Sequence, residues 1–600
     1  MIGLGALVAY KEQPAVVLEI SSKITIRVAN GAERRVREKD IEQLHPGPVS
    51  DISHVVAPVG EIETAWEMLE GNEVSLREFC ELAFEEFTPG SAWAAWQVLT
   101  AGELFRADDT KFRALPRLEV DRLRAERRKK QEAEEGRVRL VERIRSGAVT
   151  AADRASFGEI EAVARGASAN SKIMRDLGIQ PQPERAHDLL LRHGVWDPID
   201  NPYPARFGVA TRTPLTGAIE DDTTERRDLT HAEAFAIDDI GTSAADDAVG
   251  RDGDDFWVHI ADPAAGVSPG SAVSLGAYER AATLHNPEHF SHMLPENVIR
   301  RYSLGGDESR ALSFRFNFEL TGEPILREIV PSFVSVLRMT YEEADARLKD
   351  KNVMRSIEEM TRIFAGWRQT YAAPAIQLPE ARIRVEQKRI SIEPIEFGRS
   401  RDLVLESMLM VGYGVGRYAE TQRLPIPYAR QEEPELDEIP ETLSAMWSAR
   451  RRYKRSDHST IPGPHAGLGL PVYVQATSPL RRYLDLLVHQ QLRAALIGIP
   501  PLDTARVVEL IGGAEARFSE VRKVESLSDR HYTLAYLLQN SDWTGTGVVV
   551  ATGKNVTVMV PELGLEAELA GRNSYELDDE VRLQIDTVRL PTLQCYMTEV

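Results

Sequence analysis

Cysteine is scarce in this sequence of 600 residues, and its scarcity excludes several kinds of site. The two cysteines, Cys80 and Cys595, stand far apart, and no CxxC or Cys/His spacing occurs. The sequence therefore predicts neither a zinc site nor a disulfide framework. This cysteine usage is typical of a protein from the reducing cytoplasm, which is where we expect this one to be located.

Long apolar runs are also missing. No uninterrupted apolar run approaches the roughly 18 residues that a membrane helix needs. The apolar segment 1–10 lacks a basic lead and a long apolar core, so we interpret it as a strand rather than a signal peptide. We expect no membrane partner.

Positive charge is in deficit. The chain has 72 Lys and Arg against 93 Asp and Glu, a formal net charge of −21. Nucleic-acid-binding surfaces usually carry excess positive charge, so this balance argues against one. Hydrophobic residues at 42% and charged residues at 28% exclude a wholly disordered chain and a fibrous repeat, and the length suggests about four domains.

The N-terminal third predicts two small domains and a linker. Short alternating strands predict a small β-barrel over residues 1–50, and three helical segments followed by a hairpin predict a winged helix-turn-helix over 60–118. A small helical spacer fits the second pattern equally well. Residues 119–205 read as a helical and extended linker, with a charged helix over 121–145 that is typical of a solvated face.

The remaining sequence predicts a large central block and a terminal barrel. Residues 206–535 mix strands and helices, and residues 540–600 fit a five-strand OB-fold barrel. The fold class we predict is therefore α+β and multidomain, with a central mixed α/β domain flanked by small N-terminal domains and a C-terminal OB-fold.

The acidic segment 234–249 carries the most chemistry. An apolar strand ends at Asp238 and Asp239, and a short polar loop delivers Asp246 and Asp247 at the start of the next apolar stretch. Carboxylates that converge repel one another unless a cation lies among them, and oxygen ligands without thiolate or imidazole favour Mg²⁺ or Mn²⁺. The alternative is a solvated Asp-rich turn, which is the commoner fate of aspartate.

A second segment combines a helix start with two arginines. Ser478 is a good N-cap and Pro479 fits the first helical position, which would place Arg481 and Arg482 in the first helical turn. The helix dipole repels cations there, so the pair makes more sense beside an anion such as a phosphate. Surface arginines paired with nearby acids are the equally plausible alternative.

Five motifs in a fixed order resemble the ribonuclease II/ribonuclease R (RNB) exoribonuclease family. They are Ile237-Asp238 with Thr242 and Asp246-Asp247-Ala248; His259-Ile260-Ala261-Asp262; Met293-Leu294-Pro295; Glu406-Ser407-Met408; and His465 with Gly467-Leu468-Gly469 followed by Thr477-Ser478-Pro479-Leu480-Arg481-Arg482-Tyr483. Where better-known members carry cold-shock domains, this chain has the predicted barrel and helix-turn-helix. That arrangement resembles a cyanobacterial or plastid-type subgroup.

The resemblance implies a function and a set of site residues. Family members remove nucleotides one at a time from the 3′ end of single-stranded RNA by hydrolysis and release nucleoside 5′-monophosphates. It implies that Asp238, Asp246 and Asp247 bind Mg²⁺ or Mn²⁺ and activate water, and that Arg481 holds a phosphate. It also implies that RNA is contacted by Tyr341 and Glu406 at the terminal ribose and by His285, Ser478 and Arg482. The partner is then a single-stranded RNA with a free 3′ end, held in an enclosed path by a monomer with an acidic exterior.

The chain departs from the family pattern at several positions. Ala244 replaces one acidic ligand, for which Asp239 could compensate. The two aromatics that stack on RNA in relatives align with His285 and Ile383, and the OB-fold has Lys554-Asn555 where aromatics are common, so the grip on RNA is expected to be weaker. These departures leave open a catalytically weakened RNA-binding regulator, and the helix-turn-helix leaves open a DNA-binding factor.

Overall fold

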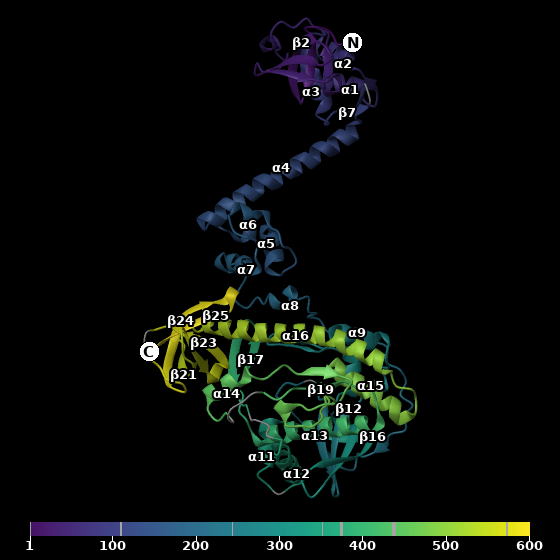
Figure 1. The fold of residues 1–600 in the computed structure, drawn as a ribbon, viewed down its shortest axis with the longest axis vertical. Coiled ribbons are helices and arrows are strands. Elements are labelled where there is room, and N and C mark those ends of the chain that lie inside the picture. Colours follow the sequence, from purple (N-terminus) through teal and green to yellow (C-terminus); the bar gives the residue numbers. More distant parts are fainter. Residues whose placement is uncertain are drawn as a thin grey trace. The chain divides into compact units, whose positions relative to one another are not determined.

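The computed structural model describes residues 2–600 except 109–110, 243, 351, 372–375, 435–439 and 572–573. The chain divides into two compact units, Met1–Ala148 and Val149–Val600 (Figure 1). The boundary lies inside the segment 119–205 that the sequence predicted as one linker. Each unit is described by itself.

The first unit begins with a five-stranded antiparallel sheet in the order β4-β3-β2-β1-β5. Its edge strands, β4 and β5, are not paired with each other in the described residues, so the predicted barrel is an open sheet in its hydrogen bonding. The apolar side chains of Ala6, Val8, Val17 and Ile26 are buried on one of its faces. The strands are β1 Leu7–Tyr10, β2 Gln13–Ile20, β3 Ile24–Val28, β4 Glu33–Val36 and β5 Glu42–His45.

Three helices and a hairpin follow where the sequence predicted them. Capping boxes at Ser75 and Thr88 fix the starts of α2 and α3, and the stacked rings of Trp93 and Trp96 lie in the core that these helices share with the sheet. The tip of the hairpin lies outside the described residues. The elements are α1 Ile62–Leu69, β6 Glu73–Val74, α2 Leu76–Phe84, α3 Pro89–Thr100, β7 Phe105–Asp108, β8 Lys111–Ala114 and the charged helix α4 Arg117–Ser146.

The second unit opens with short helices and then a six-stranded sheet in the order β10-β11-β12-β15-β16-β9. β10 also pairs in parallel with β16, which joins two strands that lie about a hundred residues apart in the chain. The elements are α5 Gly158–Ala164, α6 Lys172–Asp176, α7 Pro183–Arg192, α8 Tyr203–Arg206, β9 Arg227–Asp228, β10 Glu233–Asp238, β11 Asp247–Asp252, β12 Asp255–Ala261, β15 Gly306–Phe318 and β16 Pro324–Thr340.

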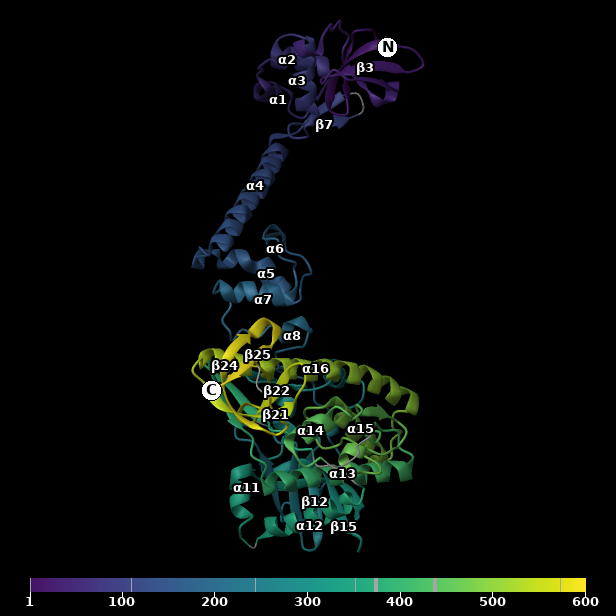
Figure 2. The same cartoon turned by 60° about the vertical axis from the view of Figure 1, so that its left-hand side comes forward.

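Side-chain alternation along the strands separates two apolar cores. Phe235 and Ile237 of β10 face the core shared with α12 and α13, whereas Ala234 and Ala236 face the core shared with α9, α10, α15 and α16. Figure 2 shows α12, α13, α15 and α16 in the same unit as strand β12 of this sheet. The helices are α9 Ala272–Arg280, α10 Glu296–Tyr302, α11 Tyr341–Arg347, α12 Val353–Gln369, α13 Arg399–Gln422, α14 Leu443–Arg450, α15 Tyr483–Ile497 and α16 Thr504–Gln539.

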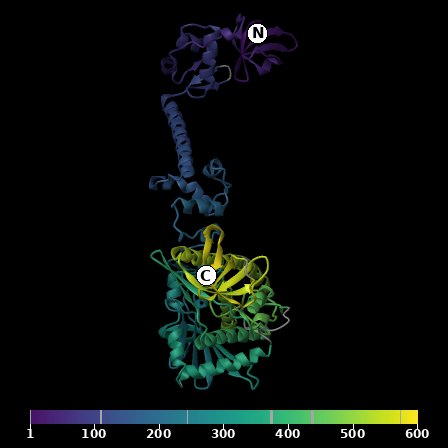
Figure 3. The ribbon, with the colours of Figure 1, turned by 90° about the vertical axis from the view of Figure 1, so that its left-hand side faces the viewer.

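The C-terminal residues form a closed five-stranded barrel, which confirms the predicted OB-like fold. The barrel, yellow in Figure 3, packs on the end of α16 through Tyr532, Leu534 and Leu537. Its strands are β21 Thr544–Ala551, β22 Val556–Val560, β23 Leu565–Leu569, β24 Glu580–Arg589 and β25 Gln594–Glu599. Three two-stranded antiparallel sheets complete the unit: the hairpins β13 Leu284–Asn286 with β14 His289–Ser291 and β17 Ala381–Glu386 with β18 Arg389–Pro394, and the pair β19 Tyr428–Arg430 with β20 Asp457–Ser459.

Among the described residues, no helix combines the length and the apolar character needed to cross a membrane.

Candidate functional site

The parallel pairing of β10 and β16 brings two predicted site residues together. Asp238, the last residue of β10, lies opposite Thr340, the last residue of β16. Thr340 is the N-cap of α11 and accepts a hydrogen bond from the backbone of Glu343, so the next residue, Tyr341, begins that helix. The sheet register therefore places Tyr341 beside the acidic loop.

Asp246 and Asp247 are fixed by pairing with the neighbouring strand. Asp247 begins β11 and lies opposite Ile260, and the backbone N–H of Ala261 donates to the carbonyl of Asp246 at 2.7 Å. The His-Ile-Ala-Asp strand thus acts as the support of the acidic pair. Its own end, Asp262, is fully buried between the guanidinium groups of Arg226 and Arg493.

The arginine segment differs from its prediction. The helix α15 begins at Tyr483 with Arg482 as N-cap, so Ser478 is not a cap and both arginines precede the helix. The N–H of Leu480, which a Ser478 cap would accept, donates instead to Asp246, and Oδ2 of Asp485 accepts hydrogen bonds from the backbone of Ser478 and from the guanidinium of Arg482. Residues 478–482 are folded into a turn, in which the backbone of Arg481 and of Arg482 donates to the carbonyl of Ser478.

This turn is joined to both neighbouring parts of the site. The carboxylate of Asp246 accepts the backbone N–H of Leu480 at 2.8 Å and Nε of Arg481 at 3.2 Å. The carbonyl of Arg481 in turn accepts the backbone N–H of Thr283 at 2.9 Å. Two segments that lie 235 residues apart in the chain are therefore in direct contact through Asp246 and Arg481.

One cavity of about 880 Å³ collects most of the predicted residues. Asp238, Asp246, Asp247, Tyr341, His285 and Arg481 line it, together with Ala244 and Ile383. Three predicted RNA contacts are not among the residues that line it. Glu406 is 8% exposed and forms an ion pair with Arg368, and Ser478 and Arg482 are bonded to Asp485.

The pKa values of the three carboxyl groups are raised, chiefly by burial. Burial raises the pKa of Asp247 to about 7, with further contributions from the charges of Asp238 and Asp246. Burial also raises the pKa of Asp238 to about 6, against the opposing charge of Arg338. The pKa of Asp246 is raised by burial as well, while Arg481 and the N–H of Leu480 oppose the rise. Such a cluster is stabilised by a cation.

The donor set fits a hard divalent cation in chemistry, because three carboxylates, that of Asp246 buried and those of Asp238 and Asp247 partly buried, line the same cavity. It is not assembled as a metal cage: the part of the chain that the structure describes contains no group of three His, Cys, Asp or Glu arranged to hold an ion. Asp239, the possible replacement for the acid missing at Ala244, is instead bonded to the guanidinium groups of Arg382 and Arg401.

Sequence reasoning missed several residues that line the cavity. Arg382 and Arg384 come from the β17–β18 hairpin, and Phe290 lies opposite His285 in the β13–β14 hairpin with their ring centroids 5.5 Å apart. Asp529 comes from α16, and burial raises the pKa of its carboxyl to about 7. No local pattern in the sequence distinguishes these arginines from exposed strand residues.

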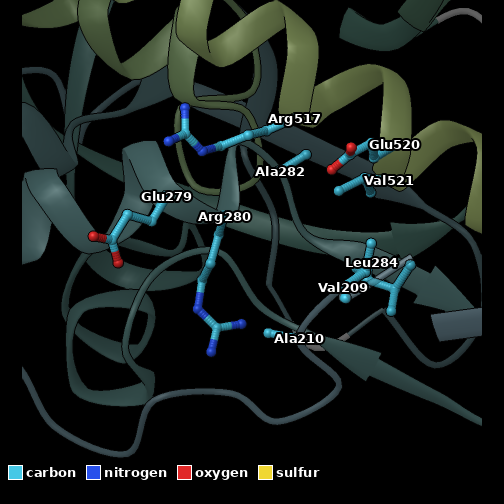
Figure 4. Close-up of a pocket in the computed structure, with 10 residues that line it drawn as sticks. Val209, Ala210, Glu279, Arg280, Ala282, Leu284, Arg517, Glu520 and Val521 are labelled. Carbon is cyan, nitrogen blue, oxygen red and sulfur yellow. The ribbon is translucent and has the colours of Figure 1, made fainter. Parts of the chain in front are cut away.

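A smaller cavity of about 100 Å³ lies on the other side of the segment that carries His285. Ala282 and Leu284 line this cavity, whereas Thr283 and His285 line the larger one, as alternation along a strand requires. Arg280 and Arg517 extend in different directions there (Figure 4), and the Arg280 guanidinium donates to the carbonyl of Arg212 at 2.6 Å. The smaller cavity therefore does not present a joint anion site.

Comparison with known families decides the identity of the central block. The family model described as the RNB domain matches residues 226–460 and 445–498. Residues 226–498 are therefore similar to an RNB domain. The match confirms the resemblance that the five motifs predicted. A second model, described as a double HTH domain, matches residues 120–202, which lie after the segment that the sequence predicted as a winged helix-turn-helix.

Similar proteins share the RNB domain and much of the remaining chain. An uncharacterized ribonuclease of Synechocystis sp. is 27% identical over 592 residues, and the match covers 89% of each chain. The chloroplastic/mitochondrial ribonuclease II of Arabidopsis thaliana is 24% identical, and the match covers 88% of this chain and 74% of the relative. Among solved structures, the Dss1 exoribonuclease of Candida glabrata superposes with a TM-score of 0.65 at 15% identity and covers 100% of this chain and 99% of its own. Mycoplasma genitalium RNase R bound to ribose-methylated single-stranded RNA gives 0.58 at 15% identity, covering 66% of this chain and 77% of its own. The solved structures share the fold of the RNB domain.

Proposed function

We propose that this protein is a 3′→5′ exoribonuclease that hydrolyses single-stranded RNA to nucleoside 5′-monophosphates with the help of Mg²⁺. One observation carries the proposal: Arg481 and the three carboxylates of Asp238, Asp246 and Asp247 line a single cavity although they come from distant parts of the chain. The names of the similar ribonucleases and the RNA bound to Mycoplasma genitalium RNase R support the same substrate class.

The cavity residues would divide the work as follows. Arg481 is 45% exposed, and among the described residues only Asp246 shares an ion pair with it, so its terminal amino groups can hold the scissile phosphate and its developing charge. Asp246, fixed by Leu480 and Arg481, orients that guanidinium. Tyr341 would contact the terminal ribose. The buried Glu406 would support this region through Arg368 rather than by touching RNA.

Asp238, Asp246 and Asp247 are the residues that would hold Mg²⁺. When bound there, the ion neutralises phosphoryl charge and lowers the pKa of a water. Mn²⁺ has the same preference for oxygen ligands and could substitute. Because Ala244 has no carboxylate, the loop would offer the ion the carboxylates of Asp238, Asp246 and Asp247.

A direct assay tests the proposal. Single-stranded RNA labelled at its 5′ end is incubated with the protein and Mg²⁺, beside samples with EDTA, with DNA of the same sequence, and with the Asp246→Asn variant. Asparagine keeps the oxygen that accepts the Leu480 N–H, so the turn is preserved while the charge is lost. We expect a ladder that shortens from the 3′ end in the sample with RNA, wild-type protein and Mg²⁺, and no shortening in the three controls. Binding of RNA by the wild-type protein without shortening would overturn the proposal.

A second candidate is a weakened RNA-binding regulator built on the nuclease scaffold. It is favoured by Ala244 in place of an acid and by the lack of a preassembled metal group in the described residues. The same assay separates the two, because the regulator binds RNA and leaves its length unchanged.

A further inference from the structure

An acidic residue outside the three-carboxylate set is held between two arginines. The guanidinium groups of Arg382 on β17 and Arg401 on α13 both donate to Oδ1 of Asp239, the latter at 2.6 Å. The three side chains are only partly buried, with exposed fractions of 38% for Asp239, 21% for Arg382 and 24% for Arg401. The carboxylate is therefore an anion that two cations share at an accessible place.

That place is the wall of the catalytic cavity. Asp239 and Arg382 both line the cavity, and Arg401 stacks on the ring of Tyr341 with its guanidinium carbon 3.9 Å from the ring centroid. Arg384, on the same strand as Arg382, also lines the cavity and lies 3.5 Å from the carbonyl of Ile240. Guanidinium groups therefore contact the loop after Asp238 at Asp239 and at Ile240.

Proteins commonly bind a nucleic-acid backbone phosphate in this way, with guanidinium groups placed around an anionic oxygen. We propose that the Asp239 carboxylate stands in for a phosphodiester of single-stranded RNA, and that Arg382 and Arg401 exchange it for a backbone phosphate when RNA binds. The proposal rests on the proposed function only in taking single-stranded RNA as the ligand. Asp239 then sets affinity: the free protein pairs its arginines internally, and RNA binds only by displacing that carboxylate.

Binding without turnover tests the exchange. Fluorescence anisotropy of labelled single-stranded RNA is measured in EDTA, so that a failure of nuclease activity, which the ladder assay reports, does not affect the result. The Asp239→Asn variant removes the competing charge and is expected to bind about threefold to tenfold more tightly than wild type, with a steeper dependence of affinity on salt. DNA of the same sequence should gain by the same factor, because the phosphate is common to both.

The matched control is Asp457→Asn. Asp457 is paired with Arg430 at 2.6 Å on the two-stranded β19–β20 sheet, and neither residue lines the cavity. This variant therefore makes the same charge change outside the cavity. It should change affinity by less than about twofold. Arg382→Ala is a separate test and should weaken the binding of single-stranded RNA at least threefold relative to wild type. Each of three outcomes would overturn the proposal. They are unchanged or weaker RNA binding by a folded Asp239→Asn protein, a gain in affinity for RNA but not for DNA, and wild-type affinity for RNA in Arg382→Ala.

Discussion

Nε of Arg481 lies 3.2 Å from Oδ2 of Asp246, and this contact joins the arginine turn to the acidic loop of the RNB domain. The same carboxylate accepts the N–H of Leu480, so it holds both the backbone and the side chain of the turn. Removing the arginine side chain leaves the backbone bond in place. The contact therefore allows function and folding to be separated by substitution.

The first prediction concerns Arg481→Ala. If its guanidinium holds the transition-state charge of the phosphate, the turnover number should fall about 10²-fold to 10³-fold. The side chain is 45% exposed, so the thermal unfolding midpoint should change little. Arg430→Ala, which removes a partly exposed arginine from the two-stranded β19–β20 sheet outside the cavity, should leave turnover near the wild-type value. Near-normal turnover in Arg481→Ala would remove Arg481 from the site.

The second prediction concerns Glu406, which the sequence placed at the terminal ribose and the structure pairs with Arg368. Both side chains are nearly buried, and Arg368 also donates to the carbonyl of Leu468. Glu406→Ala leaves a buried guanidinium unpaired and should lower the free energy of unfolding by about 3 kcal/mol, measured by urea denaturation. Glu420→Ala on the same helix breaks the exposed pair with Arg417 and should cost less than about 0.5 kcal/mol. Equal, small losses in both variants would show that the Arg368 pair contributes little.

The third prediction concerns the stabilising effect of a cation. If the carboxylates hold Mg²⁺, the folded state should gain about 2.7 kcal/mol at a free Mg²⁺ concentration of about 100 times the dissociation constant. Thermal unfolding with and without Mg²⁺ measures this gain. Asp247→Asn should lose most of it, whereas Asp254→Asn at the exposed β11–β12 hairpin tip should keep it. A gain that survives in Asp247→Asn would place the ion elsewhere.

The fourth prediction concerns stability in acid. His187 of α7 and His531 of α16 are buried with their ring centroids 5.9 Å apart, and burial lowers the pKa of each to about 3. The unfolded chain keeps an ordinary histidine pKa near 6.5, so it binds more protons than the folded state between about pH 6.5 and pH 3. Stability from these histidines is complete above that window and is lost as the pH falls through it.

Between pH 7.5 and pH 5 this loss should reach about 2 kcal/mol for each histidine. His187→Phe should show a correspondingly weaker dependence of its unfolding free energy on pH, measured by urea denaturation at both values. The control is His231→Phe, at an exposed histidine, and it should leave the pH dependence of the unfolding free energy unchanged. A wild-type pH dependence in His187→Phe would contradict the assignment.

Much of the site could be predicted from the sequence because its residues stand in motifs. The motifs group Asp238, Asp246, Asp247 and Arg481 together, and these four residues line one cavity. The start of α15 could not be predicted, because the N–H of Leu480, which a Ser478 cap would accept, donates instead to the distant carboxylate of Asp246. Tertiary bonds decided between two acceptable local choices.

The misplaced or missed residues share a different cause. Arg368, the partner of Glu406, and Arg382, the partner of Asp239, lie 38 and 143 residues away from these acids in the chain. A single sequence contains no signal for pairings at such separations, whereas strand alternation and capping are local. The cytoplasmic location and the monomeric state, which no contact within the chain reports, stay predictions.

The parallel pairing of β10 with β16 has a consequence for the order of synthesis. A ribosome that has released residues up to Asp238 has made the first carboxylate of the site, but the strand that holds Tyr341 beside it appears about a hundred residues later, and Arg481 later again. A nascent chain therefore cannot assemble the cavity until most of the protein has emerged.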